Sequence, residues 1–404
     1  MNVPKRSRRF AAVAVAAALS LTACGGGSES GGGSDSGGTD TYKMGVAMAL
    51  SGANAALGQD FVRFMEYAVE DANKAYASDG FQIEMLSEDT QATAEVGLNA
   101  LNKLATVESV PAVFTAWSAV VKAMAPASED LGVALFNIGA NSPDLEGAGA
   151  NLRNFFPLAS VDVRAVATYM AEEEGAKKAA IIRVNNATGE GAAKVYQDAF
   201  EEAGGKVVAT ETIEQDAVDA SSQVAKVLAA KPDTIHLQTL LGESSAVLKA
   251  LQEQGADVPI TTYSGVGEAV AVREASGDAL NKVIYTTLGG AKVTDPKVKA
   301  LVDRFVKDFG KEPAGISYDV YMYDSVFFYA ELIKKLRENG DEVTGENILK
   351  LVDDQKDFSN LPLQGSTTFT DAGTVIKDVI LKQIEDASKN PGEDPELATI
   401  TPQA

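Results

Sequence analysis

The chain has 404 residues, of which 45% are hydrophobic and 23% charged, and a formal net charge of −22. This apolar fraction is too high for a disordered chain, and the length suggests two domains of ordinary size. A single cysteine and a single histidine exclude an intramolecular disulfide framework and a multi-histidine zinc site. The acidity argues against nucleic acid or an anionic lipid surface as a partner, because both would repel the body.

The N-terminus has the features of a secretory signal. Residues 1–9 are basic, and an apolar run of 12 residues with one serine follows at Phe10–Leu21. This run is too short to span a bilayer, which takes about 20 residues. Removing residues 1–23 removes four positive charges and takes the net charge from −22 to −26. The segment Leu-Thr-Ala-Cys at 21–24 resembles a bacterial lipobox, which implies lipid attachment at Cys24. The alternative is an ordinary signal peptide followed by an unrelated cysteine.

A glycine- and serine-rich stretch follows the cysteine at residues 25–41. Such a composition forms a flexible coil, and 17 residues of it reach about 20 Å. No stretch of residues 42–404 approaches 18 consecutive apolar residues. The sequence therefore predicts a secreted body tethered to the outer face of a bacterial cytoplasmic membrane through its lipid anchor only.

The body alternates short apolar runs with segments of helical periodicity, which predicts parallel sheets covered by helices on both faces. The first unit is predicted from strands at 42–50, 81–86, 111–115 and 133–138 and helices at 58–77, 92–106 and 118–131. After an interruption at 154–160, the second unit is predicted from helices at 161–174, 189–203, 220–229 and 243–254 and strands at 178–184, 206–212, 234–238 and 258–262. Three further helices, at 295–309, 317–338 and 345–353, and two short strands, at 367–369 and 374–381, complete the body.

This order predicts an α/β protein with two Rossmann-like lobes. Ligands of open α/β sheets bind beyond the carboxyl ends of the strands, so the predicted site is a cleft between the lobes. No nucleophile elbow, zinc-protease helix or phosphate-binding loop is present in the sequence. The only histidine, His236, lies inside a predicted strand and is interpreted as structural. Gly189-Glu190-Gly191 is interpreted as a helix start near the cleft, because Lys194 stands where a dinucleotide loop needs a small residue. The sequence thus predicts a binding body without catalytic residues, metal ligands or a cofactor.

Five short motifs, each weak alone, occur behind the lipobox in a characteristic order: 49–52 (ALSG), 68–73 (AVEDAN), 139–145 (GANSPDL), 188–191 (TGEG) and 323–325 (YDS). Together they resemble the solute-binding proteins of bacterial ABC transporters with the type 1 periplasmic-binding fold. Within this family the chain is most similar to the branched-chain amino-acid binding group. The resemblance covers residues 42–384.

The resemblance implies a venus-flytrap arrangement in which three hinge crossings join the lobes. The crossings are expected at Phe155–Ser160, Thr286–Gly289 and Leu363–Ser366. The implied division gives a signal peptide (1–23), a lipidated tether (24–41), lobe 1 (42–157 with 288–364), lobe 2 (158–287 with 365–385) and a flexible tail (386–404).

The resemblance also implies a pocket. Ser118, at the start of a helix, corresponds to the serine that binds the ligand carboxylate, which agrees with the free N–H groups of a helix N-terminus; a plain N-cap is the alternative. The loop at Gly139, Ala140 and Asn141 is expected to contribute a carbonyl, an amide and a side-chain amide. The remaining wall positions are Leu57, Trp117, Thr188, Leu240, Ser264, Gly265 and Tyr318.

One departure from the family concerns charge. Members that bind free amino acids carry an acidic residue in the second lobe, and the matching position here is Ser264. A buried ammonium without a carboxylate partner is costly. If Ser264 replaces that acid, we expect a ligand that carries a carboxylate or amide without a free α-ammonium; an amino acid is the alternative.

Three functions follow from the sequence. The first is the solute-binding component of an ABC importer, a monomer whose partners are a small-molecule ligand and permease subunits. The second is a sensory receptor of the same fold that signals to a different partner, and the third is a secreted enzyme without a recognised motif.

Overall fold

A five-stranded parallel sheet forms the centre of the first lobe, in the order β2-β1-β3-β4-β5. Its strands are β1 (Asp40–Met48), β2 (Phe81–Asp89), β3 (Ala112–Thr115), β4 (Ala134–Asn137) and β5 (Leu152–Asn154). The helices between them are α1 (Ala55–Ala75), α2 (Ala94–Thr106) and α3 (Ser118–Asp130), with the short 3-10 helices η1 (Ala77–Asp79) and η2 (Pro143–Leu145). The computed structural model describes residues 39–401 except 53, 289–294 and 390.

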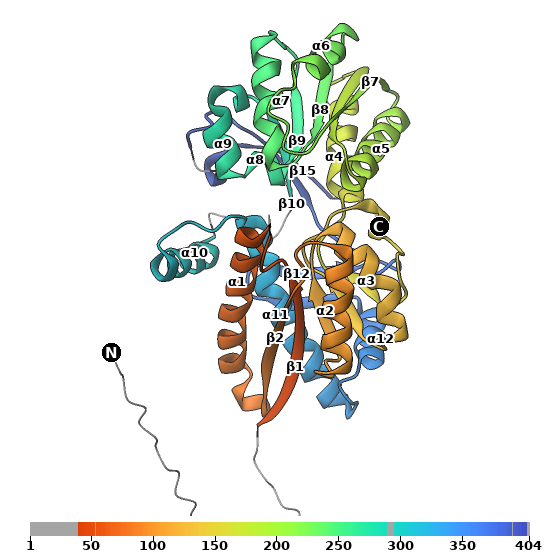
Figure 1. The fold of residues 1–404 in the computed structure, drawn as a ribbon, viewed down its shortest axis with the longest axis vertical. Coiled ribbons are helices and arrows are strands. Elements are labelled where there is room, and N and C mark those ends of the chain that lie inside the picture. The colour runs from red at the N-terminus through yellow and green to blue at the C-terminus, as the bar shows by residue number, and fades with distance from the viewer. Residues whose placement is uncertain (1–38, 53, 289–294, 390, 402–404) are drawn as a thin grey trace, which may run out of the picture. The chain divides into compact units, whose positions relative to one another are not determined.

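Later segments of the chain complete this lobe (Figure 1). They are the helices α10 (Pro296–Phe309), α11 (Ile316–Asn339) and α12 (Gly345–Gln355) and a small antiparallel sheet of β11 (Asp357–Leu361), β12 (Gly365–Phe369) and β13 (Val375–Ile376). Strand β1 alternates between two apolar clusters, as its period of two requires. Met44, Val46 and Met48 pack toward α1 and α11, whereas Ala47 packs toward α2 and α3.

The second lobe is built on a seven-stranded sheet in the order β15-β14-β10-β9-β8-β6-β7. Its strands are β6 (Lys178–Val184), β7 (Lys206–Ile213), β8 (Thr234–Gln238), β9 (Ile260–Tyr263), β10 (Ile284–Leu288), β14 (Val379–Gln383) and β15 (Glu396–Ile400). Its helices are α4 (Ala159–Glu172), α5 (Ala187–Glu202), α6 (Ser221–Ala229), α7 (Leu241–Glu253), α8 (Ser264–Gly267) and α9 (Val270–Ser276), with the short η3 (Gly277–Leu280) and η4 (Pro391–Glu393). Apolar clusters cover both faces of this sheet.

The predicted α/β architecture with two parallel-sheet lobes is confirmed. The buried residues of all four apolar clusters lie between Met44 and Ala387, and residues 39–404 form one compact unit with its own core. The predicted signal peptide, Cys24 and most of the tether lie outside the described residues. None of the described helices is both long and apolar enough to cross a membrane.

The third crossing was expected at Leu363–Ser366, and the structure places it later. Strand β12 pairs with β11, and the Phe369 ring packs on the rings of Phe328 and Phe358 in lobe 1. Thr374 also bridges to Asn154 at the edge of the first sheet. The chain therefore leaves lobe 1 only between β13 and β14. The sequence pattern of the short strand at 367–369 is compatible with either lobe. The packing of Phe369 assigns this strand to lobe 1.

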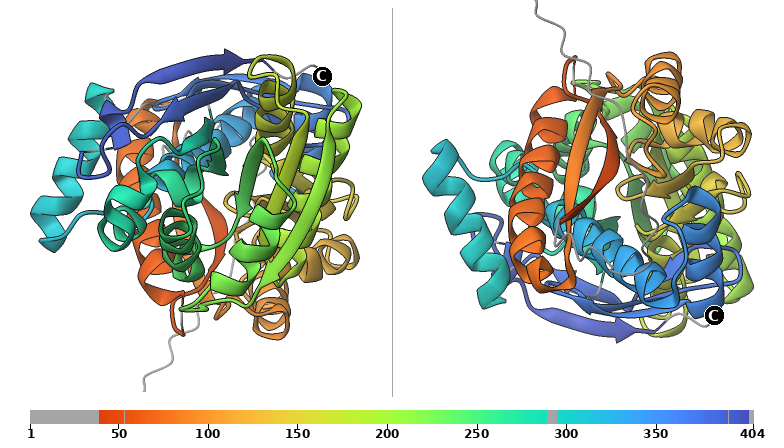
Figure 2. Two further views of the ribbon diagram at one scale, coloured as in Figure 1. Left: turned by 90° about the horizontal axis from the view of Figure 1, so that it is seen from above. Right: turned by 90° about the horizontal axis from the view of Figure 1, so that it is seen from below.

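The expected flexible tail at 386–404 is also wrong for most of its length. Strand β15 pairs antiparallel with β14 and forms one edge of the second sheet, opposite β7; both edges are seen from above in the left panel of Figure 2. Pro391 opens η4, and Asp394 behind it is buried. Pro391 therefore begins a turn of an ordered segment, and the chain from there to Ile400 is part of the second lobe.

Candidate functional site

Four helices begin directly behind the carboxyl ends of parallel strands. In lobe 1, α3 follows β3; in lobe 2, α5, α7 and α8 follow β6, β8 and β9. The predicted residues Ser118, Thr188 and Ser264 lie in the first turns of α3, α5 and α8, and Leu240 directly precedes α7. The positions chosen from the sequence thus lie at the strand ends where open α/β sheets bind ligands.

Ser118 is the first helical residue of α3, and Trp117 occupies the N-cap position. The Trp117 carbonyl accepts hydrogen bonds from the N–H groups of Val120 and Val121, at 3.0 Å each. Neither the Ser118 hydroxyl nor the N–H groups of Ser118 and Ala119 have an acceptor among the described residues. Free donors at the positive end of a helix are a favourable environment for an anionic group.

Trp117 holds a backbone conformation that bulky residues rarely adopt, with a φ of 66°. Such strain persists only where surrounding contacts impose it, and it concentrates at binding sites. The Trp117 ring is tilted against that of Phe61 at 5.8 Å, and the Phe61 ring lies 6.0 Å from the ring of Tyr318. Phe156 in turn stacks on Tyr318 at 5.1 Å.

Leu57 joins the same group through the turn before α11. A Cβ on Gly315, the N-cap of α11, would lie 2.9 Å from Leu57 Cδ1, 3.6 Å from Tyr318 Cδ2 and 3.8 Å from Phe61 Cε1, so the three side chains lie around this glycine. The structure therefore brings the predicted residues Leu57, Trp117 and Tyr318 together in one apolar wall around Phe61.

The loop behind β4 is organised by the side chain of Asn137. Its Oδ1 accepts from the N–H groups of Gly139 (3.2 Å) and Ala140 (2.8 Å), and its Nδ2 donates to the Ala140 carbonyl (2.7 Å). Both backbone groups of Ala140 are thus engaged within the protein. The Gly139 carbonyl and the Asn141 side chain are among the polar groups of this loop that have no hydrogen-bond partner in the described chain.

In lobe 2, Ser264 opens α8 and is 8% exposed. The hydroxyl of Tyr263 donates to the Thr239 carbonyl at 3.0 Å, which fixes the end of β9. A Cβ on Gly265 would lie 2.5 Å from the Tyr263 ring, so the turn packs closely on that ring.

The N-terminal turn of α5 lies against lobe 1. The Asn186 side chain caps this helix by accepting from the Gly189 N–H at 2.8 Å. A Cβ on Gly191 would lie 2.9 Å from Cγ of Pro143 in η2. The Gly-Glu-Gly segment therefore opens a helix at the contact between the lobes, as expected from the sequence.

Asp162 is an ionisable residue near the aromatic wall that the sequence analysis did not identify. It lies in the first turn of α4, is 5% exposed, and accepts from the Thr286 hydroxyl at 3.0 Å. Burial raises the pKa of Asp162 to about 6. Burial and then the negative charge of Asp162 raise the pKa of the Tyr318 phenol, so this lobe-2 carboxyl acts on the aromatic wall of lobe 1. An acidic residue in the first turn after a crossing is the signal that could have identified it.

His236 is structural, as predicted. It is fully buried, its Nδ1 lies 3.0 Å from the Thr261 hydroxyl, and its ring stacks on Tyr196 at 4.3 Å. Burial lowers the pKa of His236 to about 4, so the ring is neutral at physiological pH. Within the described ranges, no three histidine, cysteine or acidic side chains are grouped to hold a metal ion.

A family model described as periplasmic binding protein matches residues 41–390. The chain is 26% identical over 341 residues to the leucine-, isoleucine-, valine-, threonine- and alanine-binding protein of Pseudomonas aeruginosa, covering 84% of this chain and 87% of that protein. An amino acid binding protein of the same species is 26% identical over 289 residues, covering 70% and 75%.

Two solved structures show the same fold. One is the branched-chain amino acid transporter substrate-binding protein of Streptococcus pneumoniae in complex with isoleucine, with a TM-score of 0.72 and 22% identity, covering 90% of this chain and 100% of that one. The other is an ABC transporter solute-binding protein of R. palustris in complex with 4-hydroxybenzoate, with a TM-score of 0.73 and 20% identity, covering 90% and 98%.

Proposed function

The chain belongs to the periplasmic binding protein family. We propose that it captures a small carboxylate-bearing solute between its lobes and presents it to an ABC-type permease. The observation that carries the proposal is the free N-terminus of α3 beside the aromatic wall. Ser118 and the first amides of α3 receive the carboxylate, and Trp117, Phe61 and Tyr318 cover the apolar body of the solute. No catalytic step is part of this function.

In the proposed mechanism, ligand binding shifts the equilibrium between an open and a closed arrangement of the lobes. Lobe 1 supplies the anion site and the aromatic wall, and lobe 2 supplies Ser264, Gly265, Thr188 and Leu240. A ligand that touches both lobes stabilises their closed arrangement only by the difference between its affinities for the closed and open forms. The permease then recognises the closed form.

Ser264 decides which carboxylates are accepted. Its hydroxyl carries no charge, so it cannot offset the desolvation of an α-ammonium. We therefore propose an organic or aromatic acid, or an amide, as the principal ligand. The complex of a structural neighbour with 4-hydroxybenzoate supports this choice.

A free amino acid is the second candidate, and Asp162 favours it. This buried carboxyl is electrostatically coupled to Tyr318 and could accept an ammonium placed near that ring. The relatives named for branched-chain amino acids are consistent with this alternative.

A fluorescence and calorimetric screen of residues 39–404 tests the proposal. Trp117 is the only tryptophan of the chain and lies in the proposed site, so its emission reports binding directly. We expect saturable binding of at least one aromatic or short organic acid, and no change on adding leucine. Leucine binding that is lost in Asp162→Asn would support the second candidate. If no acid, amide or amino acid of the panel binds, the result contradicts the proposed function.

Lipid anchoring at Cys24 completes the proposal. The lipobox and the following glycine- and serine-rich stretch support an extracytoplasmic body attached through one modified cysteine. We expect a monomer, and size-exclusion chromatography with light scattering of residues 39–404 measures this directly.

A further inference from the structure

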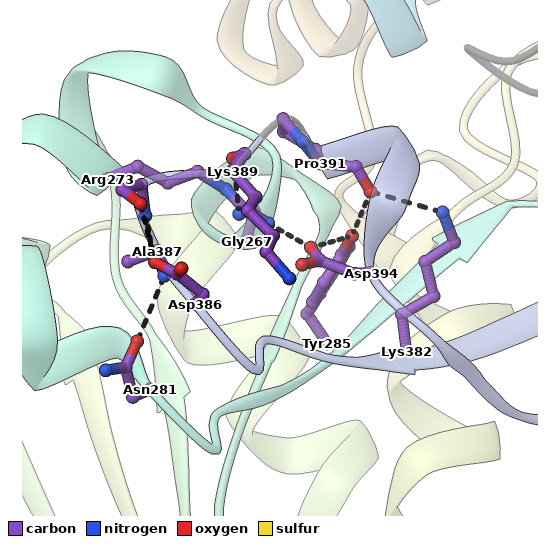
Figure 3. A network of polar contacts seen from close by, with 11 residues as sticks. Gly267, Arg273, Asn281, Tyr285, Lys382, Asp386, Ala387, Lys389, Pro391 and Asp394 are labelled. Carbon is purple, nitrogen blue, oxygen red and sulfur yellow. Dashed lines mark hydrogen bonds and ion pairs between the residues drawn. The ribbon is translucent and has the colours of Figure 1, made fainter.

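The end of the chain is built into lobe 2 through a buried ion pair. Asp394 follows η4 and is 6% exposed, and its partner Arg273 on α9 is 4% exposed. Arg273 Nη2 pairs with Asp394 Oδ2, and the Tyr285 hydroxyl donates to the same carboxylate oxygen at 2.9 Å. Figure 3 shows the three side chains converging on one point beneath the C-terminal segment.

Arg273 connects this point to the α8 turn. Its Nε donates to the Gly267 carbonyl at 2.8 Å. Gly267 also sits directly on the ring of Tyr285, since a Cβ on it would lie 2.3 Å from Tyr285 Cγ. The last residue of α8 is thus held by a hydrogen bond and by ring packing, and both holding side chains end on Asp394.

The α8 turn needs such support because it cannot hold its own shape. It has four residues, two of them glycines, and isolated helices of this length are not stable. Tyr263 fixes its N-terminal end through the Thr239 carbonyl. Arg273 and Tyr285 fix its C-terminal end. The positions of Ser264 and Gly265 therefore depend on contacts at both ends of the turn.

We propose that Asp394 is a positioning residue of the ligand site, which acts through Arg273 and Tyr285 to hold the α8 turn where Ser264 and Gly265 meet the ligand. The proposal rests on the proposed function for the identity of the ligand-contacting residues. It gives the C-terminal segment a role in binding, although the segment lies outside the predicted pocket.

The simplest competing explanation is that the pair only stabilises lobe 2. Asp394→Asn separates the two explanations, because the amide keeps the volume but removes the charge that holds Arg273. Positioning predicts a local effect on α8 in the folded protein, whereas a purely structural pair predicts lower global stability and an unchanged α8.

Asp353→Asn in lobe 1 is the control for the loss of a guanidinium–carboxylate pair, although the Asp353 side chain is 53% exposed and that of Asp394 only 2%. Asp353 pairs with Arg153 through two hydrogen bonds, from Nε to Oδ1 at 2.7 Å and from Nη2 to Oδ2 at 2.6 Å. This guanidinium–carboxylate pair has no hydrogen bond to α8. It reports what the loss of such a pair does when no ligand-contacting turn depends on it.

The first measurement is amide hydrogen exchange of ligand-free residues 39–404 at 25 °C. In Asp394→Asn we expect exchange at residues 264–268 to rise by about tenfold or more, because removing one partner of a buried pair releases the other. In Asp353→Asn the same amides should stay within about twofold of the wild type. Unchanged exchange at 264–268 in Asp394→Asn overturns the proposal.

The second measurement is the affinity for the ligand found in the screen. We expect about a tenfold weaker Kd in Asp394→Asn, carried mainly by faster dissociation, and no comparable change in Asp353→Asn. A wild-type affinity in Asp394→Asn overturns the proposal. If the wild type binds nothing in the screen, the proposed function fails while the exchange measurement still decides on positioning.

Tyr285→Phe keeps the test decisive if Asp394→Asn does not fold. This variant retains the ring beneath Gly267 and the Arg273–Asp394 pair, and removes only the hydroxyl donor. Exchange at 264–268 should rise by about twofold to fivefold. No rise in this variant contradicts the proposal.

Discussion

The buried carboxyl of Asp162 makes a prediction whose size follows from the structure. Burial raises its pKa to about 6 from a usual value of 3.8, and Thr286 and the Val163 N–H donate to its two oxygens at 3.0 and 2.9 Å. In the unfolded chain the group ionises near its usual pKa. Between pH 4 and 6 the native state therefore binds more protons than the unfolded state, and stability falls as the pH rises through this window.

The shift of about two pKa units corresponds to about 3 kcal/mol, fully present below pH 4 and lost above pH 6. Asp162→Asn removes the ionisation but keeps an acceptor for Thr286. The variant should therefore gain about 3 kcal/mol relative to the wild type on going from pH 4 to pH 7.5. Its stability at pH 4 should be lower by no more than about 1 kcal/mol, the value of one weakened hydrogen bond.

Urea unfolding followed by far-UV circular dichroism at pH 4.0, 5.5 and 7.5 measures this difference. His236 supplies the control of opposite sign, because burial lowers its pKa to about 4 from 6.5 and its contribution is lost as the pH falls through that range. His236→Phe, which keeps an aromatic ring beside Tyr196, should reduce the acid-side loss by about 3 kcal/mol. An Asp162→Asn difference that is the same at pH 4.0 and 7.5 refutes the reasoning about Asp162.

Three further variants test the site and the anchor. Ser118→Ala should weaken carboxylate ligands by about threefold to tenfold in a fluorescence titration, since it removes one hydroxyl donor to a charged group and leaves the α3 amides; an unchanged Kd would contradict the anion site. Ser264→Asp should shift the preference toward ligands with an ammonium, measured as the ratio of the Kd values for an amino acid and its deaminated analogue, and a constant ratio would show that Ser264 does not face the ligand. Cys24→Ala should release the chain from cell membranes into the medium, as measured by fractionation and immunoblotting.

The repeated alternation of strand and helix made the fold predictable, because period and spacing are local properties of the chain. The lobe to which a strand belongs is not local. Residues 365–369 read as a strand in either lobe, and only the packing of Phe369 against Phe328 and Phe358 assigns them to lobe 1. The prediction of a flexible C-terminal tail was wrong for the same reason, because the buried partner of Asp394 is Arg273, 121 residues earlier in the chain.

The site was predictable where it depends on helix starts and unpredictable where it depends on side chains from elsewhere. Ser118 and Ser264 follow strand ends that the pattern already marks. Phe61 lies on an apolar helical stripe that reads as core, and Phe156 lies in a crossing without periodicity. Asp162 resembles any acidic residue in a first helical turn, and only its burial distinguishes it.

The two lobes divide the proposed recognition unequally. The proposed anion site of lobe 1 combines the Ser118 hydroxyl with backbone N–H groups at the start of α3, which any sequence with this fold would present, and its wall is apolar and therefore tolerant of shape. Lobe 2 contributes the groups whose charge depends on a single side chain, Ser264 at the start of α8 and the carboxyl of Asp162. Discrimination between an amino acid and an organic acid therefore rests on lobe 2. A change of specificity needs one substitution there, provided that the α8 turn stays anchored through Arg273, which links the choice of ligand to the integrity of the C-terminal segment.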